Sequence, residues 1–256
     1  MWPTACHRSI DKWPGAAAVT DGDAGELLES ARGEGSSGGP TQRTVMFLDL
    51  CRFTSLNDAH GDTTAIEVID RFSDAVHASL IDRGRVVKTL GDGVLLELIS
   101  PGAAIAVADE VTRALHAAVD MPELAGGIST GPVIERDGDV LGATVNLASR
   151  LAGLAPAGEL RVTGPAAHAA ADGGWQVEPL GPVPVRGFHD LLDLFAVVLC
   201  PTDHCVVDPV CGMRISPGAT TPTVPRDGKA PSFCSPGCAD RFLEAPEQYL
   251  HEEAQP

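Results

Sequence analysis

Two aspartates stand where a carboxylate could reach a ligand from the end of a strand and from a turn. Asp49 ends the apolar run 45–48, where an unpaired carboxylate is costly to desolvate. Asp92 lies between Gly91 and Gly93, at which the backbone can come close to a ligand. Two such carboxylates can hold two Mg²⁺ or Mn²⁺ ions together with substrate phosphates. Taken singly, each aspartate is better explained structurally, Asp49 as a strand-end cap and Asp92 as a solvated turn residue.

A second pair of polar residues lies on an expected helix over residues 143–155. Asn146 and Arg150 are four residues apart and therefore share one face of that helix. Such a pair can contact a sugar hydroxyl and a phosphate, because the planar guanidinium recognises phosphate through several hydrogen bonds. An ordinary exposed polar face is the alternative for an isolated Asn/Arg pair.

Cysteines crowd the end of the chain and suggest a metal centre. Five of the seven cysteines follow residue 199, and Cys211, Cys234 and Cys238 have the spacing C-x22-C-x3-C. Converging thiolates suit Zn²⁺ or Cu⁺, and a metal would also staple a unit this small. A disulfide is the alternative, although metal binding is more common in a reducing compartment. The fourth ligand is open, with candidates at Cys205, His204 and Asp208.

The elements that must position these residues alternate between strands and helices. We expect a disordered leader over 1–42, a first domain over 43–199 and a Cys-rich unit over 200–256. The first domain is predicted to contain a strand at 44–50, helices at 62–81 and 101–119, a hairpin at 85–99 and a ribbon with its tip at Asp137–Gly138. Hairpins and crossovers occur together, so the predicted class is α+β.

The overall charge restricts the partners. The formal net charge is −17, which argues against non-specific binding to nucleic acid or to an anionic membrane surface. No apolar stretch reaches the length of about 18 residues that a membrane-spanning helix needs. The first residues also lack the pattern of a secretory signal, and we therefore expect a cytoplasmic protein.

Four motifs in the first domain resemble the catalytic domain of class III nucleotidyl cyclases, which include adenylate and guanylate cyclases. They are "FLDLCRFTSL", "VVKTLGDGVLLE", "GISTGPVIERDGDVLGATVNLASRL" and "VPVRGFHDLLDLFAV", in the family's order, and they cover about residues 44–199. The resemblance implies a ferredoxin-like βαββαβ core. It also implies a head-to-tail homodimer, in which both subunits contribute residues to each active site.

The resemblance also implies a role for each polar residue and favours ATP as the substrate. Guanylate-type enzymes usually carry Glu and Cys at the two base-reading positions, whereas this chain has a lysine and an aspartate, which match adenine. The implied roles are metal binding by Asp49 and Asp92, base recognition by Lys88 and Asp139, ribose orientation by Asn146, transition-state stabilisation by Arg150 and phosphate binding by Arg186.

The C-terminal motifs "DPVCGM", "FCSPGC" and "RFLEAPEQYL" resemble the YHS/TRASH family of small metal-binding domains over about residues 206–250. Fusion of such a unit to a cyclase suggests an adenylate cyclase modulated by metal, with the metal either structural or sensed. One departure concerns activity: Arg52 lies where the cyclase family commonly has glycine, and its side chain could either crowd the approach of the triphosphate or add a cation to it. Arg52 keeps a catalytically silent nucleotide-binding module as one alternative, and a guanylate cyclase is another.

Overall fold

The computed structural model describes residues 41–118, 120–199, 206–215, 222–224 and 230–250. The proposed leader, apart from its last two residues, and the candidate ligands His204 and Cys205 lie outside these ranges. The described chain combines one large mixed sheet with helices, which confirms the α+β class. The predicted domain boundaries at 42/43 and 199/200 stay predictions.

The first six elements form the predicted βαββαβ unit. Their strands have the order β2-β3-β1-β4 within the sheet, and each neighbouring pair is antiparallel. The elements are β1 (Thr41–Leu50), α1 (Phe53–Ser79), β2 (Gly84–Leu90), β3 (Gly93–Leu98), α2 (Pro101–Ala117) and β4 (Leu124–Arg136).

Later elements extend this sheet beyond β4. Strand β6 pairs with β4 in parallel, β8 pairs with β6 and β7 pairs with β8, while β5 folds back on the far end of β4. The elements are β5 (Asp139–Leu141), α3 (Ala143–Ala152), β6 (Glu159–Val162), α4 (Gly164–Asp172), β7 (Val177–Val183) and β8 (Leu192–Val198). Helix α4 was not predicted from the sequence, because this nine-residue alanine-rich helix has no large apolar side chains to show a helical period.

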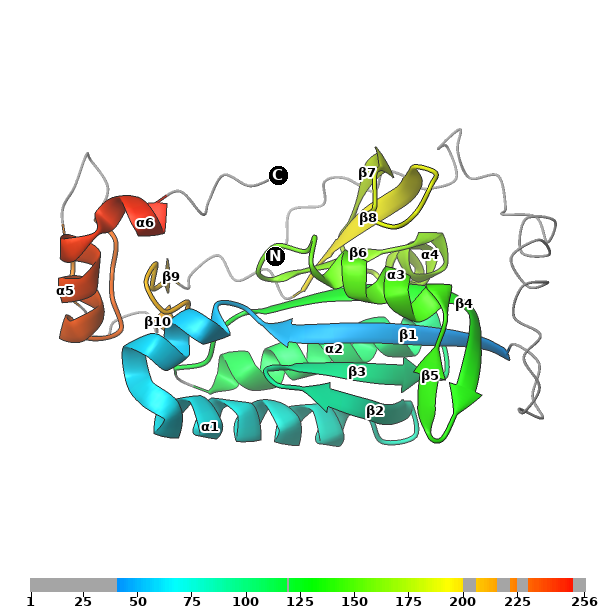
Figure 1. Ribbon diagram of the computed structural model, residues 1–256, viewed down its shortest axis with the longest axis horizontal. Helices are drawn as coiled ribbons and strands as arrows, with labels where there is room; N and C mark the ends of the chain where they lie inside the picture. The colour runs from blue at the N-terminus through cyan, green and yellow to red at the C-terminus, as the bar shows by residue number, and fades with distance from the viewer. Residues whose placement is uncertain (1–40, 119, 200–205, 216–221, 225–229, 251–256) are drawn as a thin grey trace.

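Alternate residues of the strands fill two separate cores. On one face, Met46 and Leu48 of β1 pack with α1 and α2, which cover that side of the sheet (Figure 1). On the other face, Val45 and Leu95 pack against β5 and α3. This alternation is the period-two pattern of a strand buried on both faces.

Helix α1 begins earlier than predicted. The sequence indicates a helix from residue 62, whereas α1 begins at Phe53 and is interrupted at Gly61, where φ is 81° and ψ is 169°. The break shifts the apolar face between the two segments, so only the second segment shows a sustained helical period. The short first segment, residues 53–60, therefore has its own direction.

The C-terminal elements pack near the beginning of α1, at its short first segment (Figure 1). Phe233 and Phe242 belong to the same continuous apolar cluster as the strands of the main sheet. Arg214 N donates to Met121 O at 3.1 Å, which adds a backbone hydrogen bond between the two parts. The elements are β9 (Val206–Val207), β10 (Arg214–Ile215), α5 (Pro236–Glu244) and α6 (Pro246–Leu250). None of the described helices has the length and hydropathy needed to cross a membrane.

Candidate active site and metal centre

Asp49 and Asp92 lie side by side at one end of the sheet. In the antiparallel pairing of β1 with β3, Asp49 lies opposite Gly93 at the start of β3. Leu50 N donates a hydrogen bond to Asp92 O at 3.2 Å. A Cβ atom on Gly93 would lie 2.7 Å from Asp49 Oδ1, so a larger residue would displace the carboxylate. The pairing of β1 with the β2–β3 hairpin thus brings together two acids that are 43 positions apart in the sequence.

The electrostatics of this pair call for a cation. Burial, and then the negative charge of Asp92, raise the pKa of the Asp49 carboxyl to about 6. No ion pair among the described residues involves either carboxylate. Two close oxygen donors of like charge are the kind of ligand set that suits Mg²⁺ or Mn²⁺, so the residues fit the divalent ions that the sequence implies.

Lys88 and Asp139 form a direct ion pair. Lys88 Nζ lies 2.7 Å from Asp139 Oδ2, and about two fifths of each side chain remains exposed. The hydrogen bond from Lys88 lowers the pKa of the Asp139 carboxyl. The two residues come from β2 and β5 and are predicted to read one base, so their contact places a donor beside an acceptor.

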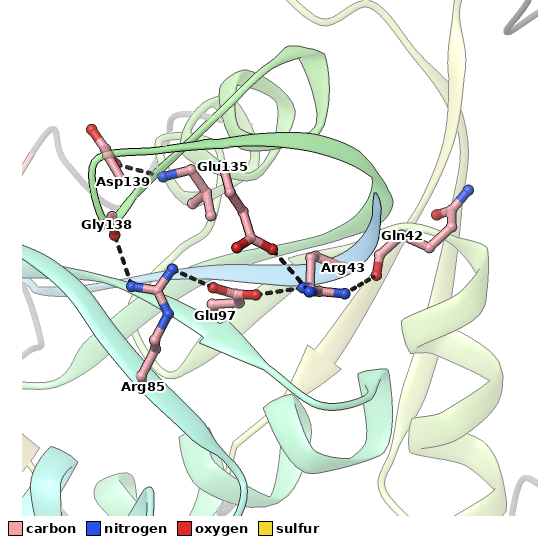
Figure 2. Close-up of polar contacts among 8 residues, drawn as sticks. Gln42, Arg43, Arg85, Glu97, Glu135, Gly138 and Asp139 are labelled. Atoms are coloured by element: carbon pink, nitrogen blue, oxygen red, sulfur yellow. Dashed lines mark hydrogen bonds and ion pairs between the residues drawn. The ribbon is translucent and has the colours of Figure 1, made fainter. Parts of the chain in front are cut away.

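A charged network reaches the tip of the β4–β5 ribbon at Gly138, next to Asp139 (Figure 2). Glu97 of β3 lies between Arg43 of β1, at 2.6 Å, and Arg85 of β2, at 2.6 Å. Arg85 also donates to Gly138 O at 2.8 Å, and Arg43 contacts Glu135 at 2.8 Å. Three strands and the tip of the β4–β5 ribbon are thereby tied together.

The remaining predicted residues lie apart from both pairs. Asn146 and Arg150 are exposed on α3, and Arg186 is exposed on the loop between β7 and β8. Val185 and Leu151 pack together, which places that loop against α3. Within the described part of one chain, no hydrogen bond or ion pair joins these three residues to the carboxylates or to the Lys88–Asp139 pair.

Arg52, at the position where the cyclase family commonly has glycine, points its side chain toward the C-terminal elements. Its φ of 58° lies in the left-handed region, which is uncommon for a residue with a side chain. Arg52 Nη1 donates to Pro209 O, and its side chain packs on Gly212, where an added Cβ would lie 2.9 Å from Arg52 Cβ. Arg52 therefore joins the turn after Asp49 to the C-terminal unit.

Three cysteines and one histidine converge in that unit. The Sγ atom of Cys234 lies 3.5 Å from that of Cys211 and 3.7 Å from that of Cys238, and all three thiols are free. His60 Nε2 lies 3.5 Å from Cys234 Sγ and 3.8 Å from Cys238 Sγ. The four ligand atoms all lie within 4.8 Å of one another. Sequence reasoning found the cysteines and missed His60, which precedes Cys211 by 151 positions and has no cysteine near it in the sequence.

Asp208, a candidate fourth ligand, has another role in the structure. It is fully buried, and its carboxylate accepts hydrogen bonds from Val210 N at 2.8 Å and Cys234 N at 2.7 Å. The described metal-ligand group does not include it. Asp208 holds together the two loops that carry Cys211 and Cys234, because its oxygens are used by their backbone amides.

A buried charged group also joins the C-terminal unit to the core. Arg214 and His116 each lie 2.9 Å from the Glu123 carboxylate, and all three side chains are at most 12% exposed. Burial would raise the pKa of Glu123, but the hydrogen bonds and charges of His116 and Arg214 together lower it below its ordinary value of 4.5. Glu123 O also accepts from Cys51 N at 2.8 Å, next to the turn that carries Asp49.

We expect Arg214→Met to destabilise the chain by about 3 kcal/mol at pH 7, because it leaves Glu123 buried with one partner fewer. A lowered pKa stabilises the fold fully above pH 4.5 and loses this effect as the pH falls through the folded-state value. The difference between wild type and variant in denaturant unfolding should therefore shrink toward pH 4. Arg83→Met, which breaks an exposed pair with Glu110, should cost less than about 1 kcal/mol. Equal losses in both variants would contradict the role of Glu123.

The C-terminal unit resembles a known family. Residues 206–253 match the family model described as YHS domain. A copper-transporting P-type ATPase of Rhizobium leguminosarum bv. viciae is 44% identical over 48 residues, which are 19% of this chain and 6% of that protein.

Longer matches are to adenylate cyclases. That of Glutamicibacter nicotianae is 34% identical over 157 residues, which are 60% of this chain and 37% of that protein. That of Streptomyces coelicolor is 41% identical over 114 residues, which are 44% of this chain and 30% of that protein. The chain thus spans about a third of the length of these relatives.

Solved structures agree on the fold. The adenylyl cyclase CyaB from P. aeruginosa has a TM-score of 0.52 at 20% identity and covers 65% of this chain and 99% of its own. The catalytic core of a rhodopsin-guanylyl cyclase with converted specificity, in complex with ATPalphaS, has a TM-score of 0.57 at 20% identity. The match covers 62% of this chain and 96% of that chain. The predicted resemblances to a cyclase core and to a YHS domain are both confirmed.

Proposed function

Because the chain joins a core of the class III cyclase fold to a C-terminal YHS domain, we propose that it is an adenylate cyclase. It would convert ATP to 3′,5′-cyclic AMP and pyrophosphate in a head-to-tail homodimer. The observation that carries this proposal is the presence of two acid-containing pairs, Asp49 with Asp92 and Lys88 with Asp139, at the positions that the cyclase resemblance assigns. The adenylate cyclase relatives support the same activity.

In the proposed reaction the ribose 3′-oxygen forms a bond to the α-phosphorus, and the bond from that phosphorus to the β-phosphate oxygen breaks. Pyrophosphate leaves, and the hydroxyl proton passes to water or to a substrate phosphate. Asp49 and Asp92 would hold two Mg²⁺ or Mn²⁺ ions, which supply activation of the hydroxyl and neutralisation of phosphate charge. No described side chain is required as a dedicated general base.

Base selection rests on Lys88 and Asp139. Lys88 can donate to a ring nitrogen of adenine, and Asp139 can accept from the exocyclic amine. Guanine presents an oxo group and a ring N–H in the corresponding places, so it would leave Lys88 and Asp139 without these hydrogen bonds. The charged network around Glu97 supports this selection, because it fixes the β4–β5 ribbon against β2.

The second subunit would supply the α3 residues. Asn146 would orient the ribose, Arg150 would stabilise charge that develops on the phosphates, and Arg186 would bind a phosphate. Their exposure on the described part of one chain, without a hydrogen bond or ion pair to Asp49 or Asp92, is expected of groups that act across an interface. A two-fold symmetric dimer makes two such sites.

Arg52 was the feature that favoured a catalytically silent module. Its side chain engages Pro209 and Gly212, and its backbone adopts the left-handed conformation that suits a glycine. The geometry therefore gives the silent alternative less support than the sequence did. A guanylate cyclase remains the alternative that differs only in the base-reading pair.

Mixing two inactive variants tests both the activity and the dimer. Asp92→Ala and Arg150→Ala are each expected to produce almost no cyclic AMP from ATP with Mg²⁺ or Mn²⁺, because each removes one half of every site. Co-refolded in equal amounts, they should recover about a quarter of the wild-type specific activity, since half of the dimers are mixed and each has one intact site.

The control mixture contains Asp92→Ala and Asp49→Ala, which damage the same half-site and should stay inactive when mixed. Recovery in the control, or none in the test mixture, would contradict the head-to-tail arrangement. A wild-type chain that makes no cyclic nucleotide would contradict the enzymatic proposal itself.

A further inference from the structure

We propose that His60 of the cyclase core is the fourth ligand of a Zn²⁺ ion held by Cys211, Cys234 and Cys238. The metal site would then belong to both parts of the chain, with one ligand from α1 and three from the YHS domain. Zinc binding would thereby fasten the C-terminal domain to the segment that follows the Asp49 turn.

The distances match a tetrahedral zinc site. With Zn–S bonds of about 2.3 Å and a Zn–N bond of about 2.0 Å, ideal tetrahedral angles place sulfur atoms about 3.8 Å apart and nitrogen about 3.5 Å from sulfur. Cys234 Sγ lies 3.5 and 3.7 Å from the other two sulfur atoms, and His60 Nε2 lies 3.5 and 3.8 Å from the sulfur atoms of Cys234 and Cys238. The two remaining ligand pairs lie within 4.8 Å. A Cys₃His set is among the ordinary structural zinc sites, whereas Cu⁺ would be satisfied by the thiolates alone.

Local structure holds each ligand in place before metal arrives. Ser235 caps α5 by accepting from Cys238 N at 3.2 Å, and Asp208 fixes the backbone of the Cys234 loop. Cys211 and Cys238 are almost fully buried. His60 is the last residue before the break at Gly61, where the positive φ ends the first segment of α1. The break lets His60 face the thiols while the rest of α1 covers the sheet.

Further contacts join the same short segment to the YHS domain. Arg241 of α5 donates to Asp58 O at 2.7 Å, and Arg52, which directly precedes the segment, donates to Pro209 O. Arg52 is three residues from Asp49. A metal bound by His60 would therefore restrain residues 52–60 and, through them, the turn that carries a carboxylate of the active site. This last step rests on the proposed cyclase function, whereas the metal site itself does not.

Metal titration of the full chain tests the site without any assay of activity. His60→Ala should lower the affinity for Zn²⁺ at least about 100-fold, since changes even outside the ligand shell cost about 10- to 100-fold. With Co²⁺ as the probe, wild type should show the intense visible bands of tetrahedral Co²⁺ with thiolate ligands, and His60→Ala should show altered bands. His77→Ala is the matched control, because His77 is exposed on the same helix and bonds to Ser73 O; it should change neither measurement.

His60→Cys separates the loss of a ligand from a folding defect. This variant should regain tight Zn²⁺ binding, with the Co²⁺ spectrum of a four-thiolate site. Unchanged zinc affinity and an unchanged Co²⁺ spectrum in His60→Ala would overturn the proposal. So would tight Cu⁺ binding that is equal in wild type and His60→Ala when Zn²⁺ binds weakly to both.

Hydrogen exchange tests the link to the core. Zn²⁺ should slow amide exchange in residues 53–60 of wild type and leave that segment unchanged in His60→Ala. Protection confined to the YHS domain in both proteins would overturn the bridging role. For the catalytic link, zinc removal should change cyclic AMP production by wild type but not by His60→Ala. If wild type binds zinc through His60 and makes no cyclic AMP, the proposed function fails and the metal site stands.

Discussion

Asp92→Asn should lower kcat for cyclic AMP formation by at least about 1,000-fold, because in the proposed mechanism it removes a charged ligand of the metal ions at the reacting phosphate. Asparagine has nearly the size of aspartate and can keep the Asp92 backbone contact with Leu50 N, so the hairpin should remain intact. The measurement is steady-state turnover of ATP at saturating Mn²⁺, with thermal unfolding followed in parallel.

Asp74→Asn is the matched control for this variant. Asp74 is exposed on α1, which covers the opposite side of β1 from α3, and its replacement removes the same charge from the protein. Wild-type turnover is expected for Asp74→Asn. Activity in Asp92→Asn within about tenfold of wild type would show that the Asp49–Asp92 pair does not hold the catalytic metals.

Replacing Lys88 and Asp139, the two residues proposed to read the base, should reverse the nucleotide preference. Lys88→Glu combined with Asp139→Cys puts an acceptor where adenine needs a donor and removes the acceptor that its amine needs. We expect the ratio of kcat/KM for ATP to that for GTP to fall by about 1,000-fold or more, as for other sites that select by buried hydrogen bonds. Cyclic AMP and cyclic GMP are measured from separate and from mixed substrates.

Two further variants test whether the change in nucleotide preference comes from the pair itself. Lys88→Glu alone faces Asp139 with a like charge at a site where the wild-type atoms are 2.7 Å apart, so it should lose activity with both nucleotides. Arg85→Gln loosens the β4–β5 ribbon through Gly138 while leaving both base-reading residues in place, and should lower turnover without reversing preference. A double variant that still prefers ATP would remove these two residues from base selection.

Much of the cyclase core could be read from short stretches of sequence. The strands around Asp49 and Asp92 show apolar runs that end in turn residues, and α2 shows helical periodicity behind its Ser100 cap. These signals depend on neighbours within a few residues, so they can be recognised without knowledge of the fold. The first segment of α1 was missed for the same reason, because Gly61 interrupts its period.

Contacts between distant parts could not be read in this way. The chemistry of Asp208 suits a metal ligand, yet its oxygens accept backbone amides once the two cysteine loops fold around it. Arg52 at a glycine position suggested either a crowded phosphate site or an added cation there, yet its side chain reaches a carbonyl 157 positions away. Residue type and spacing show which interactions a side chain can make. Which group it actually contacts depends on how distant parts of the chain pack together.

The sequence by itself determined the α+β class and indicated the two carboxylates, the Lys88–Asp139 pair and the three thiols, because each is marked by residue type beside a local strand, turn or helix signal. Tertiary structure alone decided that His60 lies with those thiols and that the YHS domain rests on the segment following Asp49. Nothing near His60 in the sequence distinguishes it from other histidines. Its position depends on a helix break and on a shared apolar core, and both are properties of the folded chain as a whole.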